Sequence, residues 1–407
     1  MSLKLAFSGG GFRATFFCLG AYRRLVELGI ADEVSSISSV SGGSITAGAI
    51  MLGLSSGKFQ SVEDFDQRVT GPLQRLGQSN LRQKIMRRSI IPRTTELASH
   101  FKPELPRTRF SRLYPKLLDE SLFQGKKIKD LPSYPEWSCN ATCLNTLKRF
   151  RFKVTDMYAG LLGQSKEIDD ITVAFAVAAS AAFPMMFAPL KLSGKGRTFV
   201  DEYCAAHAKV SPDLLYLTDG GVYDNLGSES ILKDDTPYII LDASAAEKSW
   251  GLKDRPSYLK LNSRLLSVSL DQIVNLRRRL IFTHKQGIQM ILGRSINKIR
   301  NAEQEHRPSL IDLPEYPSHY EEIEGLIGGL RTDLDAFHDV EIASLMWSGA
   351  IHTDLAVKAV APEIVPAQKW NDVPVYPFSD NISEATEILK RGQKRSNFSP
   401  LHTKLSL

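Results

Sequence analysis

The organisation of this chain follows from the stretch SSISSVSGGS, residues 35–44. Its first six residues are small or β-branched, as in a buried strand, and a helix-like stretch begins at Gly42. A strand that turns sharply into a helix places the turn residue, Ser41, in strained backbone geometry that only small neighbours permit. The Gly-x-Ser-x-Gly pattern of such a nucleophile elbow is present as SVSGG, residues 39–43. A Ser/Gly-rich turn that caps a helix would show the same pattern, so this alternative stays open.

A glycine loop, SGGGFR at residues 8–13, precedes the elbow. Leu3 to Phe7 predicts a buried strand before the loop, and Ala14 to Leu28 predicts a helix after it. Together with the elbow, these elements predict a right-handed parallel βαβ unit. Because the loop opens a helix, the backbone N–H groups of Gly9, Gly10 and Gly11 are expected to point at a bound phosphate or at an oxyanion.

A dinucleotide-binding loop is one alternative, because Gly9-x-Gly11-x-x-Ala14 fits that fingerprint. The fingerprint requires an acidic residue near the end of the second strand to hold a ribose, but no acidic residue lies between Glu33 and Glu63. The sequence also lacks Gly-Lys-Ser/Thr, which excludes a Walker-type phosphate loop. Neither nucleotide-binding motif therefore accounts for the loop.

A third motif, TDGGVYDN at residues 218–225, follows a predicted strand from Leu214 to Thr218. The strand would present Asp219 at its end, beside a glycine turn. A serine nucleophile needs a base, and the histidines, including His100, His207, His284 and His306, lie in no recognisable catalytic context. If Asp219 contacts Ser41, the two residues form a Ser-Asp dyad; the alternative is an Asp-Gly turn that satisfies its own backbone.

With these three motifs in this order, the chain resembles a bacterial-type patatin-like phospholipase. The resemblance is carried by the glycine loop (residues 8–14), the elbow (residues 39–43) and the Asp-Gly-Gly motif (residues 219–221). The stretch ASAAFP at residues 179–184 is similar to the family's segment beside the active site, and residues 331–346 look like the tail of longer members. Ser39 and Ala14 stand where glycine is more usual in the family.

The resemblance implies an α/β fold, a three-layer α/β/α sandwich with a mainly parallel central sheet. It implies hydrolysis of fatty-acyl esters of glycerophospholipids through an acyl-enzyme, without a metal or cofactor. Ser41 would be the nucleophile and Asp219 the base, and the amides of Gly9, Gly10 and Gly11 would form the oxyanion hole. Arg13, Gly43, Gly220 and Gly221 would support this site.

The resemblance also allows a regulated role, since some bacterial patatin-like proteins degrade membranes in antiphage defence when cyclic nucleotides activate them. A Ser-His-Asp α/β hydrolase is the nearest enzymatic alternative, but its elbow normally follows several strands. A catalytically idle or signal-binding protein, whose glycine loop holds an anionic ligand, is the alternative from another class.

Composition and charge favour an ordinary globular protein of 407 residues with a net charge of +6. The charge is uneven, because ten Arg/Lys residues and only two acids lie between Arg82 and Lys116. Such a segment suits an anionic surface, either phospholipid headgroups or a nucleotide-type ligand, although it would equally serve as a solvated helical insertion. We expect no DNA or RNA partner, and the oligomeric state stays open.

We predict a catalytic core over residues 1–245, with a basic helical insertion at about residues 53–130. A mainly helical extension over residues 246–407 would pack on this core. Further strands are expected at 137–144, 149–154, 187–192, 214–218 and 238–242, and further helices at 225–232, 261–292, 319–337 and 339–349.

Two further patterns concern the compartment of the protein. The four cysteines show no paired disulfide spacing and no CxxC motif, and the first residues run directly into a strand, so we expect reduced thiols and a cytoplasmic protein. Ile171 to Leu190 is nearly free of charge, but its alanines and Pro184 favour a buried helix that ends near Phe183, followed by a strand, over a membrane span. The enzyme is expected to act peripherally on a membrane.

Overall fold

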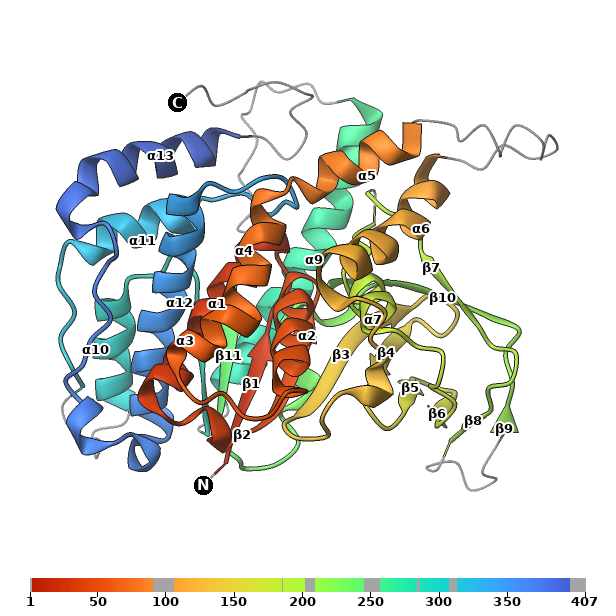
Figure 1. Cartoon of the computed structure of the whole chain (residues 1–407), viewed down its shortest axis with the longest axis horizontal. Coiled ribbons are helices and arrows are strands. Elements are labelled where there is room, and N and C mark those ends of the chain that lie inside the picture. The colour runs from red at the N-terminus through yellow and green to blue at the C-terminus, as the bar shows by residue number, and fades with distance from the viewer. Residues whose placement is uncertain are drawn as a thin grey trace.

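The computed structural model describes residues 2–90, 106–184, 186–201, 209–244, 257–283, 286–306 and 313–395. Its described strands form one sheet, with helices on both faces (Figure 1).

The central part of the sheet is parallel. Its strands lie in the order β12 (Gly287–Ile291), β11 (Tyr238–Asp242), β1 (Leu3–Phe7), β2 (Val34–Val40) and β3 (Glu136–Cys143), and each neighbouring pair is parallel. Helices cover both faces of such a sheet, which explains why β1 and β11 are nearly continuous apolar runs rather than alternating patterns.

Antiparallel strands extend the sheet beyond β3. They follow in the order β4 (Lys148–Phe152), β5 (Met157–Ala159), β6 (Gly163–Ser165), β8 (Phe199–Val200) and β9 (Lys209–Val210). A further strand, β10 (Leu214–Asp219), pairs antiparallel with the last residues of β3 and with β7 (Leu190–Ser193).

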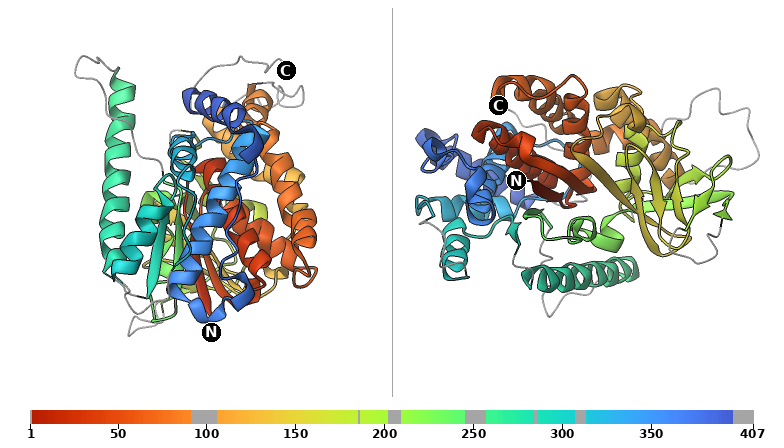
Figure 2. Two further views of the ribbon diagram at one scale, coloured as in Figure 1. Left: turned by 90° about the vertical axis from the view of Figure 1, so that its left-hand side faces the viewer. Right: turned by 90° about the horizontal axis from the view of Figure 1, so that it is seen from below.

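Two apolar cores separate the layers. The larger core lies between the sheet and a group of helices that includes α1 (Gly11–Leu28), α2 (Gly42–Leu54) and α12 (Asp339–Val360). A smaller core packs α9 (Tyr258–Phe282) against the other face, through side chains such as Ala6, Ile240 and Val274. Figure 2 shows α9 lying alone across the sheet from the other long helices. The predicted three-layer α/β fold is therefore confirmed.

The described residues also form further α-helices. They are α3 (Val62–Phe65), α4 (Gly71–Gln78), α5 (Leu81–Ile90), α6 (Pro106–Leu118), α7 (Val173–Ser180), α8 (Gly221–Asp224), α10 (Ile296–His306), α11 (Tyr320–Gly328) and α13 (Ile382–Lys394). Among the described residues, none of the helices combines the length and the apolar composition that a membrane span requires.

Helices α1 and α12 pack with their backbones in direct contact. A Cβ atom at Gly20 of α1 would collide with the carbonyl oxygen of Met346, and one at Gly349 of α12 would collide with the carbonyl oxygen of Phe17. Glycine inside a helix normally lowers its stability, so these two residues are explained by the close approach of the helices.

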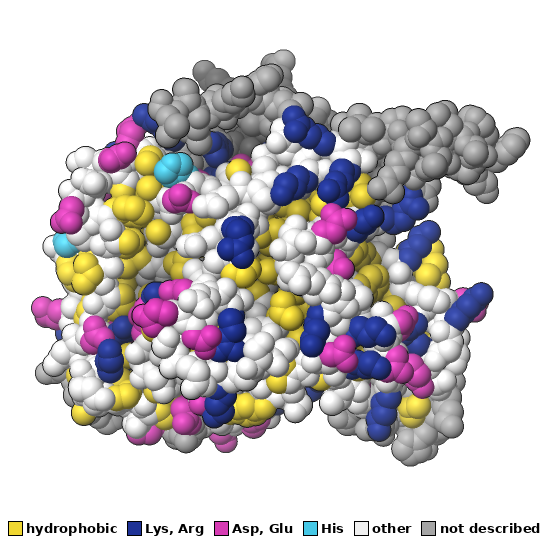
Figure 3. Space-filling model, viewed as in Figure 1, with side chains coloured by type: hydrophobic (Ala, Val, Ile, Leu, Met, Phe, Trp, Pro, Cys, Tyr) yellow, Lys and Arg dark blue, Asp and Glu magenta, His cyan; other side chains and the backbone are white. Residues whose placement is uncertain are grey.

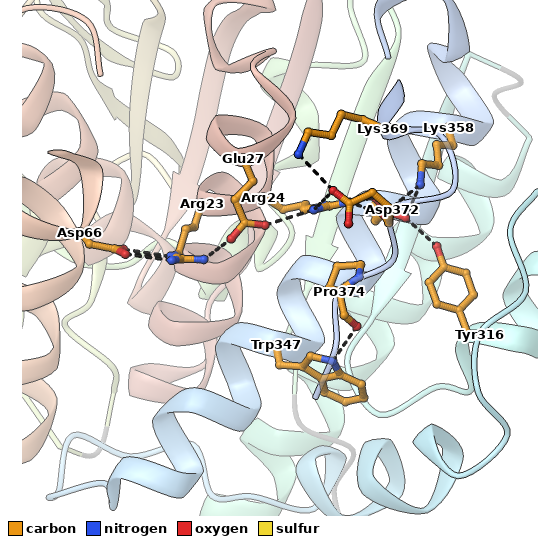
Figure 4. Close-up of polar contacts among 11 residues, drawn as sticks. Arg23, Arg24, Glu27, Asp66, Tyr316, Trp347, Lys358, Lys369, Asp372 and Pro374 are labelled. Carbon is orange, nitrogen blue, oxygen red and sulfur yellow. Dashed lines mark hydrogen bonds and ion pairs between the residues drawn. The ribbon is translucent and has the colours of Figure 1, made fainter. Parts of the chain in front are cut away.

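A buried charge cluster also joins α1 to the C-terminal region (Figure 4). Asp354 of α12 accepts hydrogen bonds from Arg24 Nη2 at 2.7 Å, from Lys358 Nζ at 2.8 Å and from Tyr316 OH at 3.0 Å. Arg24 also donates to the carbonyl of Asp372 at 2.5 Å. Each charge in this cluster has a partner, which offsets the cost of taking it out of water.

Four predicted helices differ from the structure. The helix expected at 319–337 ends at Gly328, and the one expected at 339–349 continues to Val360. The helix expected at 261–292 ends at Phe282, and Gly287–Ile291 forms the edge strand β12, because a short apolar run cannot be assigned to helix or strand by periodicity alone. The helix expected at 225–232 is absent from this described segment. Gly227 in this segment has a left-handed φ of 64°. The carboxylate of Asp224 accepts hydrogen bonds from the amides of Leu226 and Glu229, which in a helix would bond to backbone carbonyls.

Candidate active site

Ser41 occupies the turn between β2 and α2, in strained backbone geometry with φ of 52° and ψ of −121°. Small neighbours make this turn possible. A Cβ atom at Gly42 would collide with the carbonyl oxygen of Gly11, and one at Gly43 would lie 2.6 Å from the carbonyl oxygen of Phe7. The elbow therefore packs directly on the glycine loop, and Gly43 supports it by leaving room for β1.

The strand pairing on β3 brings the elbow and the Asp219 turn together. Val40, the last residue of β2, lies opposite Asn140, and Asp219, the last residue of β10, lies opposite Ala141. Strands β2 and β10 thus approach one another end to end along the same edge of β3. Ser41 and Asp219, which are 178 residues apart in the sequence, meet where the two strands end.

Asp219 is buried, with 3% of its surface exposed. Burial raises the pKa of its carboxyl to about 6, while hydrogen bonds from the Gly221 amide and the Ser41 side chain act in the opposite direction. The Gly221 amide lies 2.7 Å from Asp219 Oδ1. The Ser41 side chain therefore lies close enough to Asp219 to lower the pKa of its carboxyl, and burial keeps the carboxylate away from bulk water.

The glycine turn after Asp219 is shaped by close contacts. A Cβ atom at Gly220 would collide with the carbonyl oxygen of Asn140, and one at Gly221 would collide with the side-chain oxygen of Asn225. The amide of Gly220 donates to the carbonyl of Ser180 at 3.0 Å. Both glycines hold the turn against the adjoining strand and loop.

The glycine loop requires one correction to the expected site. The amide of Gly9 donates to the carbonyl of Asn225 at 3.0 Å, so Gly9 is not a free donor for an oxyanion. Gly10 and Gly11 adopt positive φ values of 146° and 56°, and their amides have no hydrogen-bond partner within the described residues. A Cβ atom at Gly9 would lie 3.1 Å from Ser41 Cβ, so the loop runs beside the nucleophile.

Ser180, at the end of α7, connects the parts of this site. Its Oγ accepts a hydrogen bond from the Ser41 amide at 2.9 Å and donates to the carbonyl of Asn140 at 2.6 Å. It also lies 2.8 Å from the hydroxyl of Ser44. Sequence reasoning marked residues 179–184 only as a segment beside the site, without assigning a role to Ser180.

Two more residues near the dyad were not predicted. Asn225 ends the Asp219 motif, and its side-chain amide donates to Ser244 Oγ at 2.8 Å. Tyr114 of α6 is fully buried and stacks on Phe187, and its hydroxyl has no hydrogen-bond partner within the described residues. Burial raises the pKa of Tyr114 well above its usual value, and the charge of Asp219 adds to this effect. No local sequence pattern pointed to Tyr114.

Arg13 anchors the loop. Its guanidinium donates to the carbonyls of Leu330 at 3.0 Å, Gly328 at 3.2 Å and Ala243, and burial lowers its pKa to about 10. Arg13 thus ties the start of α1 to the C-terminal region and to the end of β11.

Asp333 contacts the same loop from the C-terminal side. Its carbonyl accepts the Phe12 amide at 2.9 Å, and its carboxylate pairs with Arg82 of α5. Burial raises the pKa of the Asp333 carboxyl to about 6, and the charge of Arg82 opposes this. Asp333 lies in the stretch 331–346 that resembles the tail of longer family members, which was the only sequence signal for it.

No histidine hydrogen-bonds to Ser41 or Asp219 within the described residues; His100, His207 and His284 lie outside them. Within the same residues, no group of three His, Cys, Asp or Glu side chains is placed to hold a metal ion. Cys18, Cys139 and Cys143 are free and buried, and Cys204 lies outside the described residues.

Comparison with known proteins places the chain in a family. The model of the family described as Patatin-like phospholipase matches residues 5–230. No curated protein sequence matches the chain.

Three solved structures illustrate the structural similarity, each at 12% sequence identity. Human GIVD cytosolic phospholipase A2 aligns with a TM-score of 0.47 over 97% of this chain and 63% of its own. The same human protein in complex with methyl gamma-linolenyl fluorophosphonate aligns with a TM-score of 0.48 over 96% of this chain and 59% of its own. VipD from Legionella pneumophila aligns with a TM-score of 0.33 over 96% of this chain and 74% of its own. The chain thus spans about three fifths of the length of the human structures.

Proposed function

The chain belongs to the patatin-like phospholipase family, which indicates lipid acyl hydrolase activity, and from this premise we propose that it cleaves fatty-acyl esters of membrane glycerophospholipids. In this proposal Ser41 is the nucleophile and Asp219 is the general base. The observation that carries the proposal is the pairing of β2 and β10 on adjacent residues of β3, which joins the strained Ser41 elbow to a buried carboxylate.

The first half of the reaction forms an acyl-enzyme. Asp219 accepts the hydroxyl proton as Ser41 Oγ attacks the ester carbonyl carbon. The amides of Gly10 and Gly11 donate hydrogen bonds to the carbonyl oxygen as negative charge develops on it. Loss of one such donor typically raises the barrier by about 3 kcal/mol. The tetrahedral intermediate then releases the lysophospholipid alkoxide, which takes the proton from Asp219.

The second half of the reaction restores the enzyme. A water molecule attacks the acyl carbonyl of Ser41 while Asp219 accepts one of its protons. The fatty acid leaves, and the proton on Asp219 returns to Ser41 Oγ. The raised pKa of Asp219 suits both halves, because a carboxyl that titrates closer to neutral pH is a stronger base than an exposed aspartate.

Release of fatty acid from phosphatidylcholine vesicles tests the dyad. We expect Ser41→Ala and Asp219→Asn each to lower the rate roughly 10³-fold or more. Two matched controls lie on or beside the same strands: Ser36→Ala in β2, and Asp213→Asn at the exposed position that precedes β10. Equal release by wild type and both dyad variants would reject the mechanism, while lipid binding without release by the wild type would favour a catalytically idle protein.

The proposal includes contact with an anionic lipid surface through α5 and the neighbouring α6. Figure 3 shows Lys and Arg side chains gathered over these helices. Arg82 and Arg88 pair with Asp333 and Glu120, whereas Lys84 and Arg87 are exposed. The middle of the predicted basic segment, residues 91–105, lies outside the described residues.

A comparison of anionic vesicles with detergent-dispersed lipid tests this contact. We expect K84E/R87E to lower hydrolysis of anionic vesicles roughly tenfold and to leave hydrolysis of detergent-dispersed lipid unchanged, since each basic residue near an anionic surface contributes about 1 kcal/mol. K166E/K195E reverses two exposed charges elsewhere and is the control. An equal loss of hydrolysis in both double variants would contradict a specific docking surface. The cytoplasmic location, the antiphage role and activation by cyclic nucleotides stay predictions.

A further inference from the structure

A second site lies on the antiparallel part of the sheet. A pocket of about 360 Å³ is formed by β4, by the turn between β5 and β6, and by the segment that follows α8. Ser41 and Asp219 do not line it. Its lining includes the cations Lys148, Arg149, Arg151 and Lys233 and the aromatic rings of Tyr158 and Tyr223. The proposed hydrolysis gives this pocket no role.

The positive charge of this pocket is only partly neutralised. Two acids, Asp201 and Glu229, also line it, so cations outnumber acids four to two. Glu229 lies 3.7 Å from Arg149 Nη2 and 3.3 Å from Arg277 Nη2. Lys148, Arg151 and Lys233 form no ion pair within the described part of the chain. The net charge of the lining is therefore positive.

Each of the two arginines has a buried Nε without a hydrogen-bond partner among the described residues. Arg149 is only 8% exposed, and its Nη1 donates to Ser230 Oγ at 2.8 Å, yet its buried Nε has no partner. The buried Nε of Arg151 likewise has no partner, and its guanidinium lies over the Tyr158 ring, 5.4 Å from the centroid. Burial, followed by the nearby charges of Arg151 and Arg149, lowers the pKa of Lys233. Arg149 is buried and Arg151 half-buried, so repulsion between like charges at this site lowers stability unless an anion is bound there.

We propose that this pocket binds a small molecule that carries a phosphate group. The planar guanidinium forks of Arg149 and Arg151 suit the oxygens of a phosphate, and the lysines add charge at the rim. The volume falls in the range of small-molecule sites, which leaves room for a group attached to the phosphate. Tyr158 and Tyr223 supply apolar ring surface for that group.

The attached group could come from two sources, a soluble nucleotide or the glycerol phosphate of a lipid headgroup. Isothermal titration calorimetry of the Ser41→Ala protein with AMP, glycerol 3-phosphate and inorganic phosphate distinguishes these two sources. The tighter of the first two ligands identifies the source, and adenosine and glycerol serve as ligands without phosphate. Because the Ser41→Ala protein is used, the result does not depend on whether the protein hydrolyses lipid.

We expect saturable binding of a phosphate compound, and Arg151→Gln to weaken it roughly tenfold or more. Lys166→Gln removes an exposed charge elsewhere and should leave binding unchanged. Lys148→Gln, at an exposed position of the pocket, is the second variant should Arg151→Gln fail to fold. The proposal is overturned if no phosphate compound binds at millimolar concentration, if adenosine or glycerol binds equally well, or if a folded pocket variant binds like the parent.

Discussion

Asp219 is the residue whose titration should control the reaction. Burial raises its pKa to about 6, and only its unprotonated form can accept the Ser41 proton. We therefore expect kcat/KM to rise about tenfold per pH unit below pH 6 and to level off above it. A pH-rate profile on a soluble ester substrate measures this without interference from vesicle charge.

The position of the inflection distinguishes this carboxylate from an ordinary one. An exposed aspartate titrates near pH 4, so an inflection there would contradict a buried base. Asp213→Asn, which changes an exposed carboxylate just before the same strand, should leave the inflection in place.

The close packing of α1 against α12 predicts that alanine in place of their contact glycines destabilises the protein. Gly20→Ala and Gly349→Ala each insert a methyl group where backbone of the other helix already lies, so we expect each to lower the free energy of unfolding by about 3 kcal/mol or more. Urea denaturation followed by circular dichroism measures the change.

Gly325 of α11 provides the matched control for these glycines. A Cβ atom there would meet no other atom within 4 Å, so Gly325→Ala should raise the free energy of unfolding by about 0.5–1 kcal/mol through helix propensity. Equal effects at all three glycines would show that helix propensity, and not the contact between α1 and α12, explains them.

For the molecule as a whole, the buried cluster around Asp354 connects the N-terminal helix to the C-terminal region (Figure 4). Asp354→Ala leaves Arg24 and Lys358 with less buried counter-charge, so we expect a loss of about 3–5 kcal/mol in the free energy of unfolding. Thermal denaturation should show one transition shifted to lower temperature, because the two regions share this cluster and the larger core.

An exposed ion pair is the control for the Asp354 variant. Asp32 pairs with Lys58 at 2.8 Å, but both side chains are more than half exposed, and Asp32→Ala should cost less than about 1 kcal/mol. Two separate transitions in the Asp354→Ala protein would instead mean that residues 246–407 unfold independently of the core.

Local patterns accounted for much of the fold. The strands β1 and β11 were predicted with their bounds as observed, because runs buried on both faces are continuously apolar. Strands β5, β6, β8 and β9 were missed; they have two or three residues each, too few for a period to show. The strand at 287–291 was mistaken for the end of a helix for a related reason.

Some candidate site residues were visible in the sequence, and others were not. Ser41 and Asp219 each stand beside glycines at the end of a predicted strand, so their chemical type and position were visible in the sequence. Ser180, Tyr114 and Asp333 come from distant segments and carry no such mark. The use of the Gly9 amide by Asn225 was equally invisible, since the two residues are far apart in the chain.

The amino-acid sequence alone determined the elements around the site: a glycine loop, a strained serine turn that tolerates only small neighbours, and an aspartate at a strand end. These features depend on backbone geometry within a few residues. Tertiary structure alone decided that β10 meets the end of β2, which loop amides stay unpaired, and which cations share a pocket. Those outcomes depend on hydrogen bonds, burial and charge between segments that are remote in sequence, and no local pattern encodes them.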